Sequence, residues 1–422
     1  MSTTKINITK ALATACTCLT GVSANAETKP WYIDLAAMNY IEQDRNTGVE
    51  FLINGKRELD DGDAFSFLVE FDVVTGATPN GATASNVPQT FTTASGNGTY
   101  SVGANELPVD DTHMDTRMSL GTVYESEINS NFKISYDTRL SMEFDYFSLG
   151  GGVEFLYDFN QHNTTLFTGI NGEYNRVHPV GGTPDPLVSM PPPNTFQPRG
   201  DASVTRRQSG VHIGFNQIIN KNSLMQFKYS YSNASGYLTD PYKILSLIDD
   251  QNANSLGATV DYLFENRPDQ REIQSVFFAY KLNTQGGVAD ISYRYYWDEW
   301  DIKSNTLDMK YRIKLEQRFF IQPHLRIYGQ SSADFYRYNL NTSEPLPEYA
   351  SADLRLGEFD AYTVGFKYGK SYSEGRSHTI GVEYYTQRGD SNPDTAVGLQ
   401  RQQDLYPALN TLIFTWNYSY MW

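Results

Sequence analysis

Hydrophobic and polar residues alternate along most of this chain. The clearest case is FKISYDTRLSMEFDY, residues 132–146, in which every even position from Phe132 to Tyr146 is uncharged and most are large and apolar. Successive side chains of a strand point to opposite faces, so these groups share one face and the charged residues share the other. A run of fifteen residues is long for a strand of a soluble sheet but suits a tilted strand that crosses a membrane.

The same period recurs often enough to predict a barrel. The other alternating runs are residues 64–73, 117–125, 150–159, 164–174, 209–219, 223–232, 256–264, 272–282, 287–297, 306–315, 319–329, 331–340, 362–369, 378–387 and 411–422. We therefore expect an all-β fold, a transmembrane antiparallel β-barrel of about sixteen strands with long external loops. Residues 31–42 do not fit the order of turns. We expect them to be a periplasmic or luminal segment that precedes the barrel. Alternatively, the two runs that meet near residue 330 form one long strand, which would change the order of turns.

The linkers between these runs predict the orientation of the barrel. Outer-membrane barrels have short periplasmic turns and longer external loops. The long linkers, which we expect to be external, are 74–115, 175–207, 234–254, 341–359 and 389–409; the tight ones are 126–130, 219–222, 265–270 and 372–377. Within them, SGYLTDPYK is expected to pack in or over the lumen, whereas ENRPDQR is interpreted as an ordinary tight turn.

The last strand carries a stripe of large side chains that ends on the final residue. Its aromatic members are Phe414, Trp416, Tyr418, Tyr420 and Trp422. Such a stripe suits a strand that faces lipid, with aromatic rings at the interface. We expect Trp416, Tyr418, Tyr420 and Trp422 to be an insertion signal as well, read by the barrel-assembly machinery through pairing at the strand edge.

Composition agrees with an exported membrane barrel. The first 26 residues have Lys5 and Lys10, a short apolar core and a small-residue cleavage site, so we expect a signal peptide over 1–26 and the barrel over 27–422. Both cysteines lie in that signal, which leaves the mature chain without a disulfide or thiolate site. Loss of two lysines moves the net charge from −16 to −18, which disfavours nucleic acid as a partner.

Charged residues on the polar faces predict two luminal walls. One group of cations belongs to three runs that are neighbours in sequence, and neighbouring antiparallel strands pair. It comprises Arg294, Lys310, Arg312, Lys314, His324 and Arg326. A second group contains Asp137, Glu143 and Asp145, with Glu70 and Asp72 on the same side. Opposed charges would orient polar solutes and select ions, and the alternative is that they are paired filler in an occluded lumen.

Metal and catalytic motifs are weak. The loop PVDDTHMDTR, residues 108–117, contains Asp110, Asp111, His113 and Asp115, but a solvated acidic loop explains it better than a cation site. The sequence has no HExxH, GxSxG, P-loop or dinucleotide motif. We therefore expect no metal, no cofactor and no enzymatic activity.

Several segments resemble a known family. They are DVVTGATPNGA (72–82), HNTTL (162–166), HPVGG (178–182), SGYLTDPYKILS (235–246), ENRPDQR (265–271), YRYYWDEWDIKSNT (293–306), QPHLRIYGQSSADFYR (322–337) and YASADLRLGEFDAYTVGFKYG (349–369). In these the chain resembles a family of uncharacterised Gram-negative proteins, known only as a domain of unknown function, that look like outer-membrane barrels. The resemblance implies the fold and an outer-membrane location and brings no catalytic residue. An insert around 83–105 departs from the family pattern.

Three functions remain after these observations. We expect a pore or transporter-like barrel for small polar or charged solutes. The alternative is a non-conducting scaffold that binds periplasmic partner proteins, and an outer-membrane enzyme ranks third.

Overall fold

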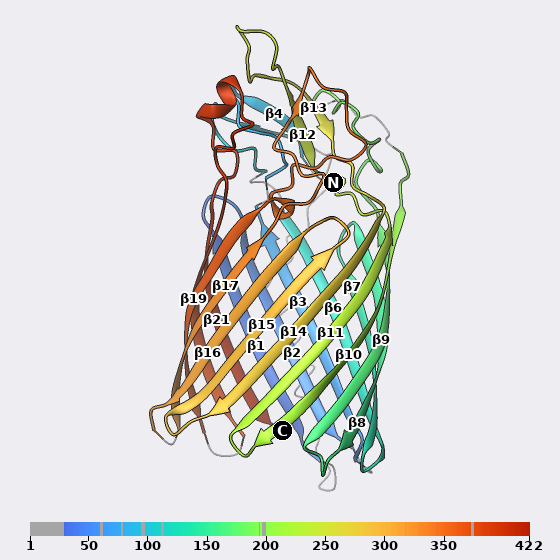
Figure 1. The fold of residues 1–422 in the computed structure, drawn as a ribbon, viewed down its shortest axis with the longest axis vertical. Helices are drawn as coiled ribbons and strands as arrows, with labels where there is room; N and C mark the ends of the chain where they lie inside the picture. Colours follow the sequence, from blue (N-terminus) through green and yellow to red (C-terminus); the bar gives the residue numbers. More distant parts are fainter. Residues whose placement is uncertain are drawn as a thin grey trace.

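Sixteen strands form a closed antiparallel barrel (Figure 1). The computed structural model describes residues 29–422 except 60–61, 77–78, 94–97, 111–113, 194, 196–199, 317 and 373–374, so the expected signal peptide lies outside the described residues. In ring order the strands are β1 (Trp31–Glu42), β2 (Thr47–Glu58), β3 (Ala64–Thr75), β6 (Met114–Asn129), β7 (Phe132–Met142), β8 (Tyr146–Phe159), β9 (Thr164–Val177), β10 (Val204–Asn220), β11 (Ser223–Gly236), β14 (Gln270–Asn283), β15 (Gly287–Asp298), β16 (Lys303–Lys314), β17 (Phe319–Gln330), β19 (Phe359–Ser371), β20 (Ser377–Gly389) and β21 (Leu409–Met421).

The ring closes where the first strand meets the last. β1 pairs with β21 over eleven residue pairs, from Tyr32–Met421 to Glu42–Thr411. Beyond that ladder, Trp31 and Trp422 exchange both backbone hydrogen bonds, at 2.8 and 2.9 Å. Closure gives hydrogen-bond partners to the backbone groups that an open edge strand would leave unpaired. Unpaired backbone groups are too costly in lipid for a membrane-spanning strand.

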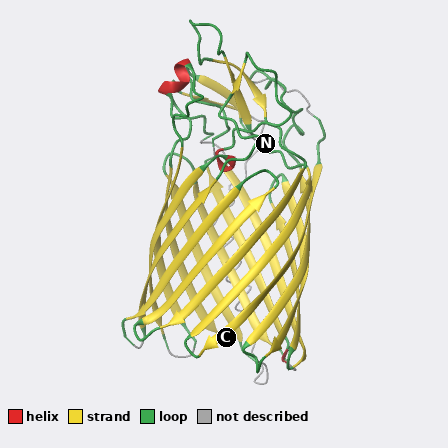
Figure 2. Cartoon of the chain, in the orientation of Figure 1, coloured by secondary structure: helices red, strands yellow, loops and turns green. Residues whose placement is uncertain are grey.

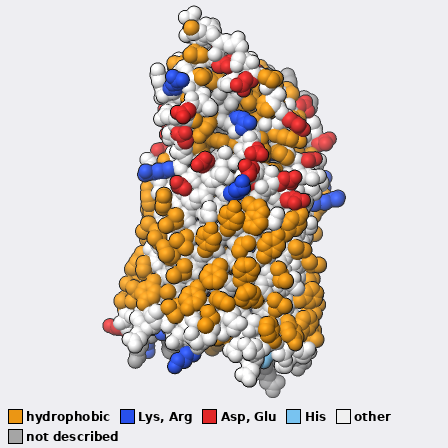
Figure 3. Space-filling model, in the orientation of Figure 1, with side chains coloured by type: hydrophobic (Ala, Val, Ile, Leu, Met, Phe, Trp, Pro, Cys, Tyr) orange, Lys and Arg blue, Asp and Glu red, His pale blue; other side chains and the backbone are white. Residues whose placement is uncertain are grey.

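The outer surface of the barrel is apolar. Alternate residues of paired strands line up in rows, as in Leu120–Leu140–Leu149, in which Leu120 and Leu149 are exposed and Leu140 is half-buried. Figure 3 shows the result as a band of hydrophobic side chains around the strands, with charged groups gathered above it. An exposed apolar surface of this extent marks a membrane-spanning protein. Among the described residues, no helix is long and apolar enough to cross a membrane.

The prediction of a barrel of about sixteen strands is confirmed, but two of the strands were misplaced. Residues 31–42 are not a segment that precedes the barrel: they form β1, which pairs with β2, a strand that the sequence pattern did not reveal. β2 was missed because Gly48 and Gly55 interrupt its alternation. Both glycines have a packing role, since an added Cβ would lie 2.0 Å from the Tyr40 ring at Gly48 and 2.3 Å from the Phe67 ring at Gly55.

Two predicted barrel strands belong to the external loops instead. Residues 256–264 contain β13 (Thr259–Phe264), which pairs with β12 (Ile244–Ile248) outside the barrel. In residues 331–340 the alternating aromatic groups face a small apolar core rather than lipid: Phe335 and Tyr336 pack with Trp300, Ile302, Ala333 and Leu356. Alternation indicates that one face of a segment is covered by apolar surroundings, but it does not distinguish lipid from protein.

Five long loops cover one end of the barrel, and we call their described residues the cap. The loops are 76–113, 178–203, 237–269, 331–358 and 390–408. They contain β4 (Gln89–Thr92), β5 (Thr99–Val102), β12, β13, β18 (Leu340–Asn341) and the 3-10 helices η2 (Leu354–Leu356) and η3 (Gly398–Gln402) (Figure 2). The other end has only short turns, such as 130–131 and 221–222. The cap therefore marks the external side.

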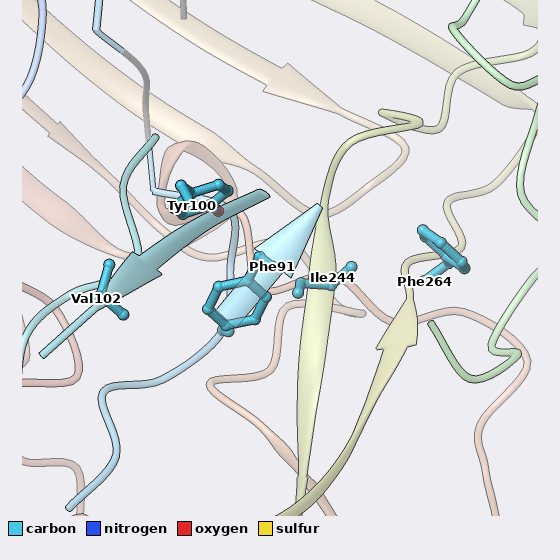
Figure 4. Packing of buried hydrophobic residues seen from close by; sticks show 6 residues of the cluster. Phe91, Tyr100, Val102, Ile244 and Phe264 are labelled. Carbon is cyan, nitrogen blue, oxygen red and sulfur yellow. The ribbon is translucent and has the colours of Figure 1, made fainter. Parts of the chain in front are cut away.

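The cap has its own cores. One of them joins the first long loop to the third: Phe91 and Tyr100 of the β4–β5 hairpin pack with Ile244 of β12 and Phe264 of β13 (Figure 4). The rings of Phe91 and Tyr100 lie 5.6 Å apart. The described residues of the segment 83–105 thus include part of a packed core.

Candidate solute-binding cavity

A cavity of about 660 Å³ lies between the cap and the barrel wall. Its wall comes from the external ends of β8–β10 and β14–β17, and its roof comes mainly from residues 237–242 and 353–356. The segment SGYLTDPYK thus packs over the lumen, as expected, whereas ENRPDQR is no ordinary tight turn: its Arg267 and Arg271 line the cavity.

Arginine dominates the charged lining. Six arginines and four carboxylic acids line the cavity: Arg206, Arg267, Arg271, Arg294, Arg326 and Arg355, with Glu143, Asp145, Asp240 and Asp353. Three of the arginines have carboxylate partners. Arg271 lies 2.5 Å from a fully buried Asp298 and stacks on Trp300 at 4.1 Å. Arg267 and Arg355 belong to a network in the roof.

The roof network joins two loops, and all its members except Arg355 are largely buried. Arg267 Nε lies 2.6 Å from Glu265, and its Nη2 lies 2.9 Å from Asp353. Arg355 contacts Asp353 at 2.5 Å and Asp240 at 3.2 Å. Burial alone would raise the pKa of Asp353, but Lys243, Arg355 and Arg267 hold that pKa well below its usual range. Asp353 is therefore ionised, and we call the Glu265–Arg267–Asp353–Arg355 network the roof latch.

The other three arginines lack such partners. No described carboxylate lies in ion-pair distance of Arg206, Arg294 or Arg326. Arg206 donates to the Tyr146 hydroxyl at 2.9 Å, while its Nε is buried without an acceptor. Arg294 lies 5.6 Å from the ring centre of Tyr296. These three groups are available to a ligand.

The acidic side of the cavity lies in the turn between β7 and β8. Glu143 and Asp145 are not on the strand that the sequence pattern predicted, because β7 ends at Met142. Burial, followed by the charge of Asp115, raises the pKa of Glu143 to about 7. The hydroxyl of Tyr242 donates to Asp145. This side therefore carries less negative charge near neutral pH than its two carboxyl groups suggest.

The predicted cation group lies on one luminal wall, formed by β15–β17. Residue parity places Arg294, Lys310, Arg312, Lys314, His324 and Arg326 on the lumen face, opposite to the lipid-facing Leu307 and Ile327. β3 is third and β15 eleventh in the ring, eight positions apart in sixteen, so the strands that carry Glu70, Asp72 and Asp137 lie across the lumen. Only Arg294, Arg326, Glu143 and Asp145 of the predicted residues line the cavity.

Below the cavity, carboxylates pair with some cations of the luminal wall formed by β15–β17. Lys310 lies 3.0 Å from Asp308. His324 lies 2.9 Å from Asp308 through Nε2 and 3.0 Å from Glu383 through Nδ1, so each ring nitrogen contacts one of the two acids. Arg312 packs on the Phe320 ring at 3.6 Å. The sequence pattern missed Asp308 and Glu383 as partners, although both occupy the polar face of their strands.

The predicted insertion residues lie on the outer face of the barrel at the seam, the place where β1 pairs with β21 and closes the ring. Trp416, Tyr418 and Tyr420 are stacked along β21, with ring centres 6.4 and 5.5 Å apart, and Trp422 follows the strand. In the acidic loop 108–117, Asp111 and His113 lie outside the described residues. No group of three metal-ligating side chains occurs in the described part of the chain.

Comparison with known proteins places the chain in a family. The family described as "Protein of unknown function (DUF3570)" matches residues 9–420. The chain belongs to this family. A search of curated proteins found no match. With this sequence family and this barrel, the protein is an outer-membrane β-barrel.

A comparison with solved structures found similar chains at low sequence identity. A ferric enterobactin receptor mutant from Pseudomonas aeruginosa is 10% identical, with a TM-score of 0.43 over 87% of this chain and 55% of the receptor. A siderophore receptor from Acinetobacter baumannii is 7% identical, with a TM-score of 0.41 over 89% and 57%. A bacterial polysaccharide outer membrane secretin is 8% identical, with a TM-score of 0.42 over 92% and 98%. The chain thus spans little more than half the length of the two receptors.

Proposed function

We propose that this protein is a capped outer-membrane pore for small polar or charged solutes. The observation that carries the proposal is the arginine-rich cavity at the external end of a lumen whose walls bear opposite charges. A barrel of sixteen strands is wide enough to leave an aqueous channel between its walls. Opposed luminal charges orient polar solutes and favour ions of one sign. The proposal involves no catalytic step.

The placement of the charges supports passage over a purely structural role. A filled, structural lumen gains most from apolar or fully paired side chains, because unpaired charge in a dry interior is costly. Here Arg294 and Arg326 face the cavity without a carboxylate partner among the described residues. Water and solute would supply the missing partners.

The cap controls access in this proposal. Residues 237–242 and 353–356 roof the cavity, and the ion pair between Arg355 of the roof latch and Asp240 ties the two segments together. Solutes would enter between the cap loops or after the roof moves. The same feature favours the second candidate, a non-conducting scaffold for periplasmic proteins, because a roof that never opens would block the mouth.

Conductance in planar bilayers separates the two candidates. The test compares the parent with a Lys310→Glu, Arg312→Glu, Lys314→Glu variant, and uses Lys221→Glu in the turn between β10 and β11 as a charge control. A pore gives discrete steps, with a reversal potential that moves toward cation selectivity only in the luminal variant. A silent parent, with unchanged solute uptake in a deletion strain, would support the scaffold.

A further inference from the structure

We propose that the cavity beneath the cap binds small organic anions with two or more carboxylate or phosphate groups, through Arg206, Arg294 and Arg326. The inference deepens the proposed function, since such an anion would be the solute that enters the pore. It starts from the division of the six cavity arginines into two sets, one held by protein carboxylates and one without a carboxylate partner among the described residues.

The first set is satisfied within the protein. Arg267, Arg271 and Arg355 lie 2.5–2.9 Å from Asp353 or Asp298, and both of these acids are buried. A guanidinium in such a pair has little attraction left for a ligand. These arginines stabilise the roof and the adjacent wall.

The second set is prepared for an anion. Guanidinium groups bind carboxylate and phosphate oxygens through paired hydrogen bonds, and they do so best when their orientation is already fixed. The hydroxyl of Tyr146 holds Arg206, and Tyr296 packs beside Arg294. The buried Nε of Arg206 has no acceptor, which is a cost that a bound anion nearby would reduce.

Three separated cations require more than one negative group on the ligand. Arg206 is on β10, whereas Arg294 and Arg326 are on β15 and β17, with only β16 between those two. A volume of about 660 Å³ lies in the range of small-molecule sites and is far larger than a single inorganic ion needs. Tyr237, Tyr242 and Tyr328 also line the cavity and offer rings to the organic part of the ligand.

The acidic side does not cancel this preference. The pKa of Glu143 near 7 leaves that group partly neutral at physiological pH, and Asp145 accepts a hydrogen bond from Tyr242. Arg117, which is outside the proposed site, is a positively charged neighbour that lowers the pKa of Glu143 against the effect of burial. The anion-binding side of the cavity thus keeps its positive charge.

Calorimetric titration of the purified barrel in detergent tests the inference with two probes. Citrate carries carboxylates and pyrophosphate carries phosphates, so the pair identifies which chemistry the site prefers. The variants are Arg294→Gln and Arg326→Gln, and the control is Arg139→Gln, because Arg139 faces the lumen from β7 and does not line the cavity. Heat-modifiable migration on gels verifies that each variant is folded.

We expect at least one probe to bind, with affinity at least tenfold lower in either cavity variant and unchanged in Arg139→Gln. Binding of neither probe, or equal binding by the Arg294→Gln, Arg326→Gln double variant, would overturn the inference. The outcome is separate from that of the proposed function. A barrel that binds citrate but never conducts refutes the pore alone, and a conducting barrel that binds neither probe refutes the anion site alone.

Discussion

The roof latch gives the sharpest stability prediction. Asp353 is 3% exposed and accepts from Arg267 and from Arg355, which comes from its own loop. In Asp353→Asn the side-chain shape is kept but the charge is lost, so Arg267, itself largely buried, keeps only Glu265. Removing one member of a buried ion pair costs about 3–5 kcal/mol. The exposed position of Arg355 and the remaining amide oxygen favour the lower end of that range.

A cost of about 3 kcal/mol corresponds to roughly a hundredfold change in the equilibrium between closed and open cap. Hydrogen exchange measures that equilibrium at single amides, since protected amides exchange through local opening. We expect amides of β12 and β13 to exchange about a hundredfold faster in Asp353→Asn, and amides of the barrel strands to stay unchanged.

The matched control is Asp301→Asn. Asp301 pairs with Lys303 at 2.8 Å, but both side chains are more than half exposed. Such surface pairs contribute less than about 1 kcal/mol, and Asn tolerates the positive φ of 64° at this position. Our reasoning fails if Asp353→Asn changes cap exchange no more than Asp301→Asn does, or if it accelerates the barrel strands equally.

Three further predictions concern the cavity, the seam and the wall. Because Glu143 becomes neutral below pH 7, the affinity for citrate should rise about threefold from pH 8 to pH 6 relative to Glu143→Gln, and parallel pH profiles would contradict this. Deleting Tyr420 to Trp422 should leave the chain in the periplasm or degraded, because it removes the seam contact and the outer stripe; normal surface levels by immunoblot would refute the insertion signal. Gly55→Ala should lower the urea midpoint of the folded barrel by displacing Phe67, at a cost of about 1–3 kcal/mol, whereas Gly172→Ala, with its nearest contact at 3.9 Å, should not; equal midpoints would show that Phe67 moves freely.

Much of the barrel could be predicted because strand patterning is local. Fourteen of the sixteen barrel strands overlap runs in which side chains alternate within ten or so residues. β2 was not predicted because glycines interrupt its alternation. These glycines make room for aromatic rings of β1 and β3, so the cause is in the neighbouring strands and not in the sequence of β2. Residues 331–340 were wrongly predicted to be a barrel strand, because aromatic groups that face a protein core alternate like those that face lipid.

The candidate site could be predicted only where it rests on strand parity. Parity is sufficient to place Arg294 and Arg326 on the lumen face. The roof depends on contacts between residues that are far apart in sequence: Arg267 meets Asp353 across 86 positions, and Tyr242 meets Asp145 across 97. No periodicity within one segment encodes such a pair. The segment ENRPDQR was misinterpreted as a simple turn for this reason.

The two parts of the molecule meet different physical demands, and this explains where its ion pairs lie. In lipid, a strand must satisfy its backbone through its neighbours, and its side chains need only be apolar on one face. The cap has no such ladder, so it relies on small cores and on buried pairs such as Arg267 with Asp353. The backbone ladder of the barrel does not depend on these cap contacts. Cap and barrel amides should therefore respond differently to the loss of one carboxylate in the cap.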